Sequence, residues 1–223
     1  MMQDITISAL FDLSHTIAAK YLANLTYPWE ALPYIGEWIL ALGPTLDAAE
    51  YDEIAPTVWV AKSAEVAPSA VIEAPAIIGP EAKIRHCAYV RGNALIGAGV
   101  TVGNSTEVKN AILFDGVQVP HFNYVGDSIL GYRAHLGGGA LLSNFRSDGA
   151  SITVRGEGFD FPTGMRKVGA MIGDFGEIGA GAVLNPGTVV GPEAVVYPLV
   201  AVRGAVPARS IYKERGNIVA RKL

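Results

Sequence analysis

An interval of six residues constrains the fold of this chain more than any other feature. Every sixth residue from Ile54 to Val108 is β-branched and aliphatic, and the residue four positions after each of the first nine is small. A helix repeats every three to four residues and an amphipathic strand every two, so neither produces an interval of six. A second run of the same kind extends from Ile172 to Val206.

This interval predicts short strands joined by tight bends, with three strands in a coil of eighteen residues. Successive coils would stack at the strand spacing of ~4.8 Å. The aliphatic side chains would then form an internal column that neighbouring coils bury. Glycines in IGAGVTVGN and IGAGAVLNPG suit bends that need a positive φ or a close approach. The sequence therefore predicts an all-β fold, a left-handed parallel β-helix of hexapeptide repeats.

The ends of the chain lack the repeat. Residues 1–50 are expected to form a small helical N-terminal cap over the first coil, with one short helix in LSHTIAAKYLANL and another in ALPYIGEWILALG. Ser14 is the expected N-cap of the first helix, and Pro28 lies near the start of the second. The β-helix is expected over 51–207 and a C-terminal tail over 208–223.

An insertion over 146–170 separates the two repeat runs. It is expected to contain a hairpin in which ITVR and FDF flank GEG. Because a stacked coil accepts an insertion only at a corner, this loop is expected to project outward, as functional loops on rigid scaffolds often do.

Composition excludes several classes of protein. Half of the 223 residues are hydrophobic and the net charge is −4 without a run of basic residues, which argues against nucleic-acid or anionic-membrane binding. A single cysteine, Cys87, excludes an internal disulfide framework and favours a reducing compartment. The N-terminal residues MMQDITISAL have no basic region, and no apolar run reaches 18 residues. A soluble, cytoplasmic protein is expected.

The repeat is interrupted at QVPHFNYVGD, residues 118–127. Downstream of it Leu130, Leu136 and Leu142 keep the six-residue interval but are out of phase with Val108. An irregular coil is therefore expected at 118–127, and His121 and Tyr124 lie within it.

Two cations upstream of the interruption are also expected to share a face. Arg91 and Lys109 are eighteen residues apart, one full coil, so their like charges would stack on adjacent strands and repel. A bound phosphate would explain this arrangement. The alternative is that Glu107 and solvent neutralise the pair.

These stretches together resemble a known family. The run VRGNALIGAGVTVGNSTEVKN, then VPHFNYVGD, a glycine-rich coil ending in SN, and IGDFGEIGAGAVLNPGTVVG resemble the acetyltransferase half of the bifunctional N-acetylglucosamine-1-phosphate uridyltransferase and glucosamine-1-phosphate acetyltransferase. The resemblance covers residues 54 to about 215. No counterpart of the uridyltransferase half is found in the sequence, so nucleotidyl transfer is not expected.

The resemblance implies transfer of an acetyl group from acetyl-CoA, as co-substrate, to the amine of glucosamine-1-phosphate, without a metal. It also implies a homotrimer with its sites between subunits. The residues that match substrate-binding and catalytic positions are Arg91, Lys109 and Lys167 for the phosphate, Tyr124 for the sugar, and His121 and Asn144 for the reaction. Arg215 matches an arginine in the tail that contacts the coenzyme.

Four positions depart from the family pattern. His135 replaces a sugar-binding asparagine, and Phe145 replaces a tyrosine. Ala180 stands in place of a serine that contacts the coenzyme, and Pro198 in place of a small residue near it. These changes leave the identity of the sugar and of the acyl donor open.

The expected chemistry needs one base and one oxyanion donor. His121 would take the proton from the sugar amine, and Asn144 or a backbone N–H would stabilise the tetrahedral oxygen. Two other functions fit the fold. The first is a sugar-phosphate-binding or regulatory protein without turnover. The second is a zinc enzyme resembling the β-helical carbonic anhydrases, with His86 and His121 as ligands, but FNYVGD offers no third ligand.

Overall fold

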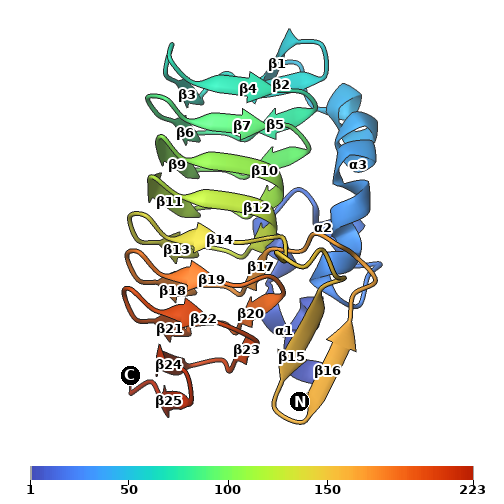
Figure 1. Ribbon diagram of the computed structural model, residues 1–223. Coiled ribbons are helices and arrows are strands. Elements are labelled where there is room, and N and C mark those ends of the chain that lie inside the picture. Colours follow the sequence, from blue (N-terminus) through green and yellow to red (C-terminus); the bar gives the residue numbers. More distant parts are fainter. Residues whose placement is uncertain (1, 223) are drawn as a thin grey trace.

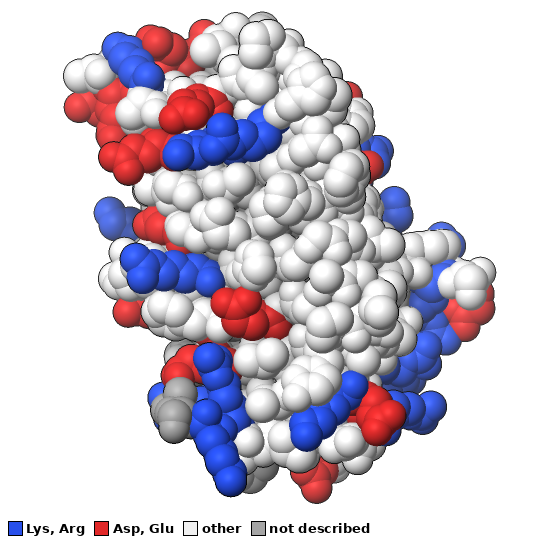
Figure 2. Space-filling model, turned by 90° about the vertical axis from the view of Figure 1, so that its left-hand side faces the viewer, with Lys and Arg blue, Asp and Glu red and all other residues white. Residues whose placement is uncertain are grey.

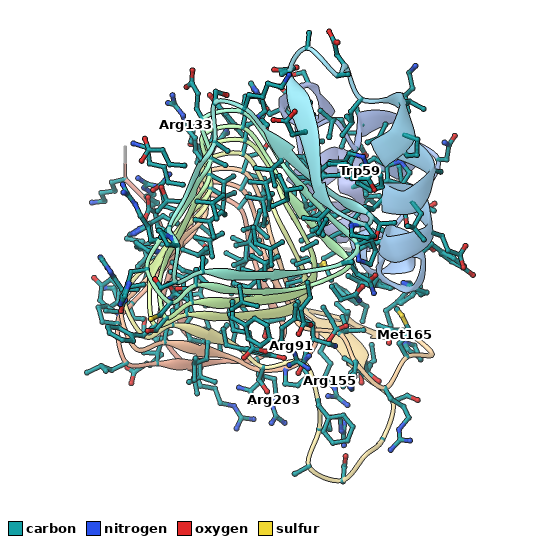
Figure 3. The ribbon with its side chains drawn as sticks, turned by 90° about the horizontal axis from the view of Figure 1, so that it is seen from above. Trp59, Arg91, Arg133, Arg155, Met165 and Arg203 are labelled. Carbon is teal, nitrogen blue, oxygen red and sulfur yellow. The ribbon has the colours of Figure 1, made fainter. Side chains whose placement is uncertain are left out.

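The computed structural model describes residues 2–222 and confirms the left-handed parallel β-helix. The coils stack in sequence order from β2 (Val58–Ala61) to β24 (Ser210–Glu214) (Figure 1). In a regular coil, Ile78 pairs with Ile96, eighteen residues later. Viewed along the axis, the coils have a triangular outline (Figure 3), so the stack has three faces.

The helix-covered face lies against the N-terminal segment. Its strands are β2 (Val58–Ala61), β5 (Ala76–Ile78), β8 (Ala94–Ile96), the second halves of β10 (Glu107–Leu113) and β12 (Tyr124–Leu130), β17 (Ala170–Ile172), β20 (Thr188–Val190) and β23 (Ala205–Val206).

The open face is a sheet of its own. Its strands are β3 (Glu65–Val66), β6 (Lys83–Ile84), β9 (Thr101–Asn104), β11 (Gln118–His121), β13 (His135–Leu136), β18 (Glu177–Ile178), β21 (Val195–Val196) and β24 (Ser210–Glu214).

The hairpin face is the third. Its strands are β4 (Val71–Glu73), β7 (Tyr89–Arg91), the first halves of β10 and β12, β14 (Leu141–Leu142), β19 (Val183–Leu184) and β22 (Ala201–Val202).

Antiparallel strands occupy both ends of the stack. At one end β1 (Tyr51–Ala55) pairs with β2, and at the other β25 (Asn217–Ala220) pairs with β24. Ile54, expected as the first inward residue, lies in β1 and is 59% exposed, so that expectation is wrong. Val66 is 38% exposed because it belongs to the first coil, which has no parallel coil beyond it. From Ile78 onward the aliphatic column is buried.

The N-terminal segment consists of short helices. They are η1 (Met2–Ile5), α1 (Ile7–Leu10), η2 (Leu13–His15), α2 (Ala19–Leu22), η3 (Pro28–Tyr34), α3 (Ile35–Leu42) and η4 (Gly43–Thr45). Within residues 2–222 none of the helices has the length and apolar character needed to cross a bilayer.

These helices run along the side of the stack and do not cover the first coil as expected (Figure 1). α3 contacts β5, β8 and β10, while η3 contacts β12. Ile35 and Ile39 are fully buried there, and a Cβ on Gly36 would lie 2.4 Å from Asn93 Oδ1. α3 therefore buries more apolar surface against a face formed by several coils than it would against the end of a single coil.

The N-cap of the helix expected in LSHTIAAKYLANL also differs from expectation. The Asp12 side chain, and not Ser14, caps η2 by accepting from the Ser14 backbone N–H. Pro28 does begin η3. The Asp12 N–H in turn donates to Asp174 Oδ2 at 2.7 Å, which ties the N-terminal segment to a lower coil.

The interruption of the repeat lies at two corners, the first at Asn110 and the second at Asp127, the last residue of 118–127. Val119 and Val125 are six apart and both fully buried, so the stretch QVPHFNYVGD keeps the inward pattern. Val108 pairs with Val125, only seventeen residues later, and Val125 with Leu142 after seventeen more. Two successive coils are each one residue short, and this shifts the phase of every later aliphatic residue. The irregularity expected at 118–127 is therefore confined to the end of that stretch, at the corner that contains Asp127.

The insertion contains the expected hairpin, β15 (Thr153–Gly156) paired antiparallel with β16 (Phe159–Pro162). Leu142 pairs with Leu184 across it, 42 residues on where a regular coil takes eighteen, so the insertion adds 24 residues. Its tip projects beyond the triangular outline (Figure 3), but its base is packed: Val154 is fully buried and the Phe161 ring lies 4.6 Å from that of Tyr27.

Candidate functional site

A pocket of about 410 Å³ lies on the hairpin face, beside the base of the insertion. We call it the upper pocket. Its lining residues are Arg91, Lys109, Tyr124, Asn144, Phe145 and Lys167. The strands explain the convergence: β7, β10 and β12 are neighbours in the stack, and an antiparallel bridge between Phe145 and Lys167 brings the end of the insertion back to its start. The structure thus places five expected site residues around one space.

Each of the stacked cations has its own carboxylate. Arg91 Nη1 lies 2.7 Å from Glu107 Oε1, a hydrogen bond that raises the pKa of Arg91. Lys109 Nζ lies 3.6 Å from Asp127 Oδ2. The alternative that Glu107 neutralises the pair therefore holds for Arg91 only. Across residues 2–222, Lys167 has no carboxylate within ion-pair distance, so it is the unpaired cation of the upper pocket.

Asn144 holds Tyr124 in place. Its Nδ2 donates to Tyr124 Oη at 3.1 Å and also to Asp127 Oδ2. Burial raises the pKa of Tyr124, so this hydroxyl stays protonated at neutral pH. Both N–H groups of the Asn144 amide are engaged, so neither is free to donate to a ligand in this arrangement.

Asp127 is the central residue that sequence reasoning missed. Its side chain is 7% exposed, and it also accepts from Asn110 Nδ2 at 2.8 Å. Asn110 and Asp127 occupy the shortened corners, with φ of +48° and +47°, and Asn93 has +48° one coil earlier. Asparagine and aspartate tolerate this left-handed backbone better than other side chains. The signal was present in the sequence, because polar residues recur every seventeen positions from Asn93 to Asn144.

Gly126 makes room for this network. A Cβ at this position would lie 2.4 Å from Tyr124 Oη and 2.8 Å from Asn144 Nδ2. Glycine is therefore required here for close approach of two side chains to the strand.

His121 does not line the upper pocket. It ends β11 at the corner between the open face and the hairpin face, three residues before Tyr124, and its side chain is exposed. Its backbone N–H donates to Asn123 Oδ1 at 3.1 Å. Its neighbour Phe122 is 62% exposed and has φ of +52°, an unusual backbone for a bulky residue.

The remaining expected residues lie elsewhere. His135 is on β13 of the open face, with Nδ1 2.9 Å from Glu177 Oε2. Ala180 and Pro198 are exposed near the corner that carries His121, and Arg215 is exposed between β24 and β25. None of the four lines the upper pocket.

Two other histidines have structural contacts. His86 Nδ1 lies 2.6 Å from Ser69 Oγ, and the His15 ring stacks on Tyr132 with centroids 3.6 Å apart. In the part of the chain that the structure describes, no three histidine, cysteine or acidic side chains gather as metal ligands would.

Comparison with known proteins finds similarity over part of the chain. Residues 72–163 match the family model "GMPPB C-terminal domain". The bifunctional protein GlmU of Methanococcus maripaludis is 39% identical over 87 residues, which is 39% of this chain and 21% of that protein. GlmU of Methanocaldococcus jannaschii is 30% identical over 136 residues, 61% of this chain and 33% of that protein. The chain therefore matches a fifth to a third of the length of these relatives.

Solved structures resemble this one less closely. The polySia-specific acetyltransferase NeuO has a TM-score of 0.47 and 15% identity, with 71% of this chain and 82% of that chain covered. A perosamine N-acetyltransferase mutant from Caulobacter crescentus, solved with CoA and GDP-perosamine, has a TM-score of 0.37 and 19% identity over 66% of this chain and 51% of that one. Likeness at this level carries no information on function. The sequence relatives alone show that this chain is similar to part of GlmU proteins.

Proposed function

We propose that this chain transfers an acetyl group from acetyl-CoA to the amine of a sugar phosphate bound in the upper pocket, with glucosamine-1-phosphate as the substrate. The observation that carries this proposal is the convergence of Arg91, Lys109, Lys167 and Tyr124 on one space of about 410 Å³. That volume lies in the range of small-molecule sites. The similarity to GlmU sequences supports the same reaction.

Phosphate binding follows from the charges of the pocket. Lys167 has no carboxylate partner, so it offers its charge to a ligand without losing an ion pair. Arg91 and Lys109 add charge-assisted hydrogen bonds from the other side of the pocket. With the phosphate fixed, the sugar ring would rest against Tyr124, which Asn144 holds in position.

The reaction is a direct transfer. The amine nitrogen attacks the thioester carbonyl carbon, a C–N bond forms, the C–S bond breaks and CoA leaves as the thiolate. His121 takes the proton from the nitrogen and passes it to the thiolate sulfur, which gives the thiol; this contributes typically ~10²–10⁴-fold in rate. A backbone N–H stabilises the oxygen of the tetrahedral intermediate.

A homotrimer would bring His121 into such a site. Large apolar side chains surround this corner, with Phe122 62%, Tyr197 41% and Leu199 85% exposed. Figure 2 looks onto this side of the molecule, where charged side chains lie mostly toward the edges of a broad uncharged area. Large exposed apolar side chains on an uncharged area favour an interface between copies. Ala180, Pro198 and Arg215 would then contact the coenzyme between subunits.

Release of the CoA thiol from acetyl-CoA in the presence of glucosamine-1-phosphate tests the proposal. We expect amine-dependent release from the natural chain and a loss of at least about a hundredfold in His121→Ala. The matched control is His86→Ala, an exposed histidine two coils away on the same corner, which should release thiol at the normal rate. Equal rates in both variants would contradict the role of His121.

Binding without turnover is the second candidate. It is favoured by the position of His121 outside the upper pocket and by the engagement of both Asn144 N–H groups. Glucosamine-1-phosphate that binds the chain without any thiol release would support it over the enzyme.

A further inference from the structure

A second pocket adjoins the upper one on the hairpin face. It has a volume of about 350 Å³, and we call it the lower pocket. Its walls come from the start of the insertion, from β15 of the hairpin, and from the corners after β19 and β22. Phe145 lines both pockets, so the two lie next to each other on either side of this residue. Phe145 is 43% exposed, and the Arg166 guanidinium lies 6.0 Å from its ring centroid.

The lower pocket is basic in a chain whose net charge is −4. Its charged lining residues are Arg146, Arg155, Arg203 and Asp148. Seen along the axis, Arg91 of the upper pocket and Arg155 and Arg203 of the lower one project from the same face, beside the hairpin (Figure 3).

One of these arginines is free to bind a ligand. Arg146 Nε donates to Asp148 Oδ1 at 2.9 Å, and Arg155 Nε lies 3.4 Å from Asp160 Oδ2. Arg203 is exposed, and within residues 2–222 no carboxylate lies within ion-pair distance of it. Like Lys167 in the upper pocket, Arg203 can therefore offer its charge to a ligand without losing an ion pair.

Polar groups complete the lower pocket. Ser143, Ser147, Thr153 and Asn185 also line it. The Asn185 amide donates to Val202 O at 2.8 Å, which fixes its orientation and leaves its oxygen and second N–H for a ligand. This set of arginines, hydroxyls and an amide suits phosphate oxygens and a ribose better than an apolar chain.

The strand order sets the distance that one ligand must span to occupy both pockets. Along the hairpin face the order is β7, β10, β12, β14, β19 and β22. The upper pocket is built on strands β7 to β12 and the lower one next to β19 and β22, so their centres are separated by three to four strand spacings, roughly 14–19 Å. A sugar monophosphate is too short for that distance, whereas a sugar joined to a nucleoside through a diphosphate spans it.

We propose that the lower pocket binds the nucleoside diphosphate part of a nucleotide-linked amino sugar whose sugar ring lies in the upper pocket. This inference rests on the proposed function for the identity of the sugar and extends its substrate class. The phosphate next to the sugar meets Lys167, the diphosphate passes Phe145, and Arg203 binds the second phosphate. The residues expected to contact the coenzyme, Ala180, Pro198 and Arg215, line neither pocket, which favours the sugar nucleotide over CoA.

Calorimetric titration of the full chain tests the inference, with UDP-glucosamine, UDP, GDP, CoA and glucosamine-1-phosphate as probes. We expect UDP or GDP to bind, and UDP-glucosamine to bind at least about tenfold more tightly than glucosamine-1-phosphate. Arg203→Ala should weaken nucleotide binding about tenfold and leave glucosamine-1-phosphate binding unchanged. Because Arg203 is exposed and unpaired, the variant should fold; Arg85→Ala, on the open face, is the matched control.

Each outcome separates the two proposals. If neither nucleotide binds, or if Arg203→Ala binds them as tightly as the natural chain, the lower-pocket proposal is overturned. If CoA displaces the nucleotides and itself loses affinity in Arg203→Ala, the pocket belongs to the coenzyme, and the proposal is again overturned. If nucleotide binding depends on Arg203 while no thiol release occurs with any amino sugar, the lower pocket stands and the proposed acetyl transfer fails.

Discussion

Asn110 donates a 2.8 Å hydrogen bond to the Asp127 carboxylate, which lies one coil further along the stack. Both residues sit at corners where the coil is one residue short, and both have a left-handed backbone. The same carboxylate accepts from Asn144 and lies 3.6 Å from Lys109 Nζ. The irregularity of the repeat and the upper pocket are therefore one feature, because the shortened corner places the acid that positions the side chains of the pocket.

Asp127→Asn tests this link. Asparagine tolerates the backbone, but its amide would place an N–H against Asn110 or Asn144, which already donate there, and Lys109 would lose its partner. We expect the free energy of unfolding in urea to fall by about 1–3 kcal/mol. Asp160→Asn, in an exposed ion pair of the hairpin, should change it by less than about 0.5 kcal/mol. Equal stability of the two variants would show that Asp127 does not organise the corner.

Lys167→Ala tests phosphate binding in the upper pocket. The side chain is exposed and unpaired, so its loss should leave stability unchanged. Affinity for glucosamine-1-phosphate, measured by calorimetry, should fall about tenfold or more, as expected for one charge-assisted hydrogen bond to a phosphate. Lys83→Ala, on β6 of the open face, should bind normally. Unaltered binding in Lys167→Ala would place the phosphate elsewhere.

Much of this arrangement was predictable from the sequence. A six-residue interval of aliphatic side chains has few structural solutions, and alternation along strands fixed the outward direction of Arg91 and Lys109. The turn sequence GEG marked the hairpin. Each of these follows from local chemistry or from a strict period.

Other features depend on contacts that a sequence pattern does not specify. The apolar residues of α3 showed that the helix must pack but not against which surface, and it lies along the stack. A six-residue count shows that the phase has shifted but not at which corners residues are lost, so the stretch 118–127 includes the corner at Asp127 and leaves out the one at Asn110. His121 follows a strand into a corner, where alternation no longer fixes the direction of a side chain.

Phe122→Asn combined with Leu199→Asn tests the interface between copies. Both positions have a left-handed backbone, with φ of +52° and +59°, that asparagine accommodates more easily. The fold should therefore be retained while the exposed apolar surface is lost. Light scattering should report trimers for the natural chain and monomers for the double variant. Cys87→Asn, exposed at the same corner with φ of +56°, is the matched control and should remain trimeric; a monomeric natural chain would contradict the assembly.

The raised pKa of Tyr51 predicts that the folded chain loses stability at alkaline pH. Burial, together with the charges of Glu50 and Asp115, raises the pKa of Tyr51 from 10.0 to about 12. Between these values the unfolded chain has released the proton and the folded chain still holds it, so stability falls as the pH rises. Tyr51→Phe should remove at most about 2 kcal/mol of that decline between pH 10 and pH 12, measured by urea unfolding. Parallel declines in both proteins would contradict the shift.

A crystal structure of the complex with glucosamine-1-phosphate tests most directly whether a sugar phosphate binds in the upper pocket. We expect phosphate oxygens within hydrogen-bond distance of Lys167 and of Arg91 or Lys109, with the sugar ring against Tyr124. A phosphate bound elsewhere, or an upper pocket that stays empty at saturating ligand, would contradict this expectation.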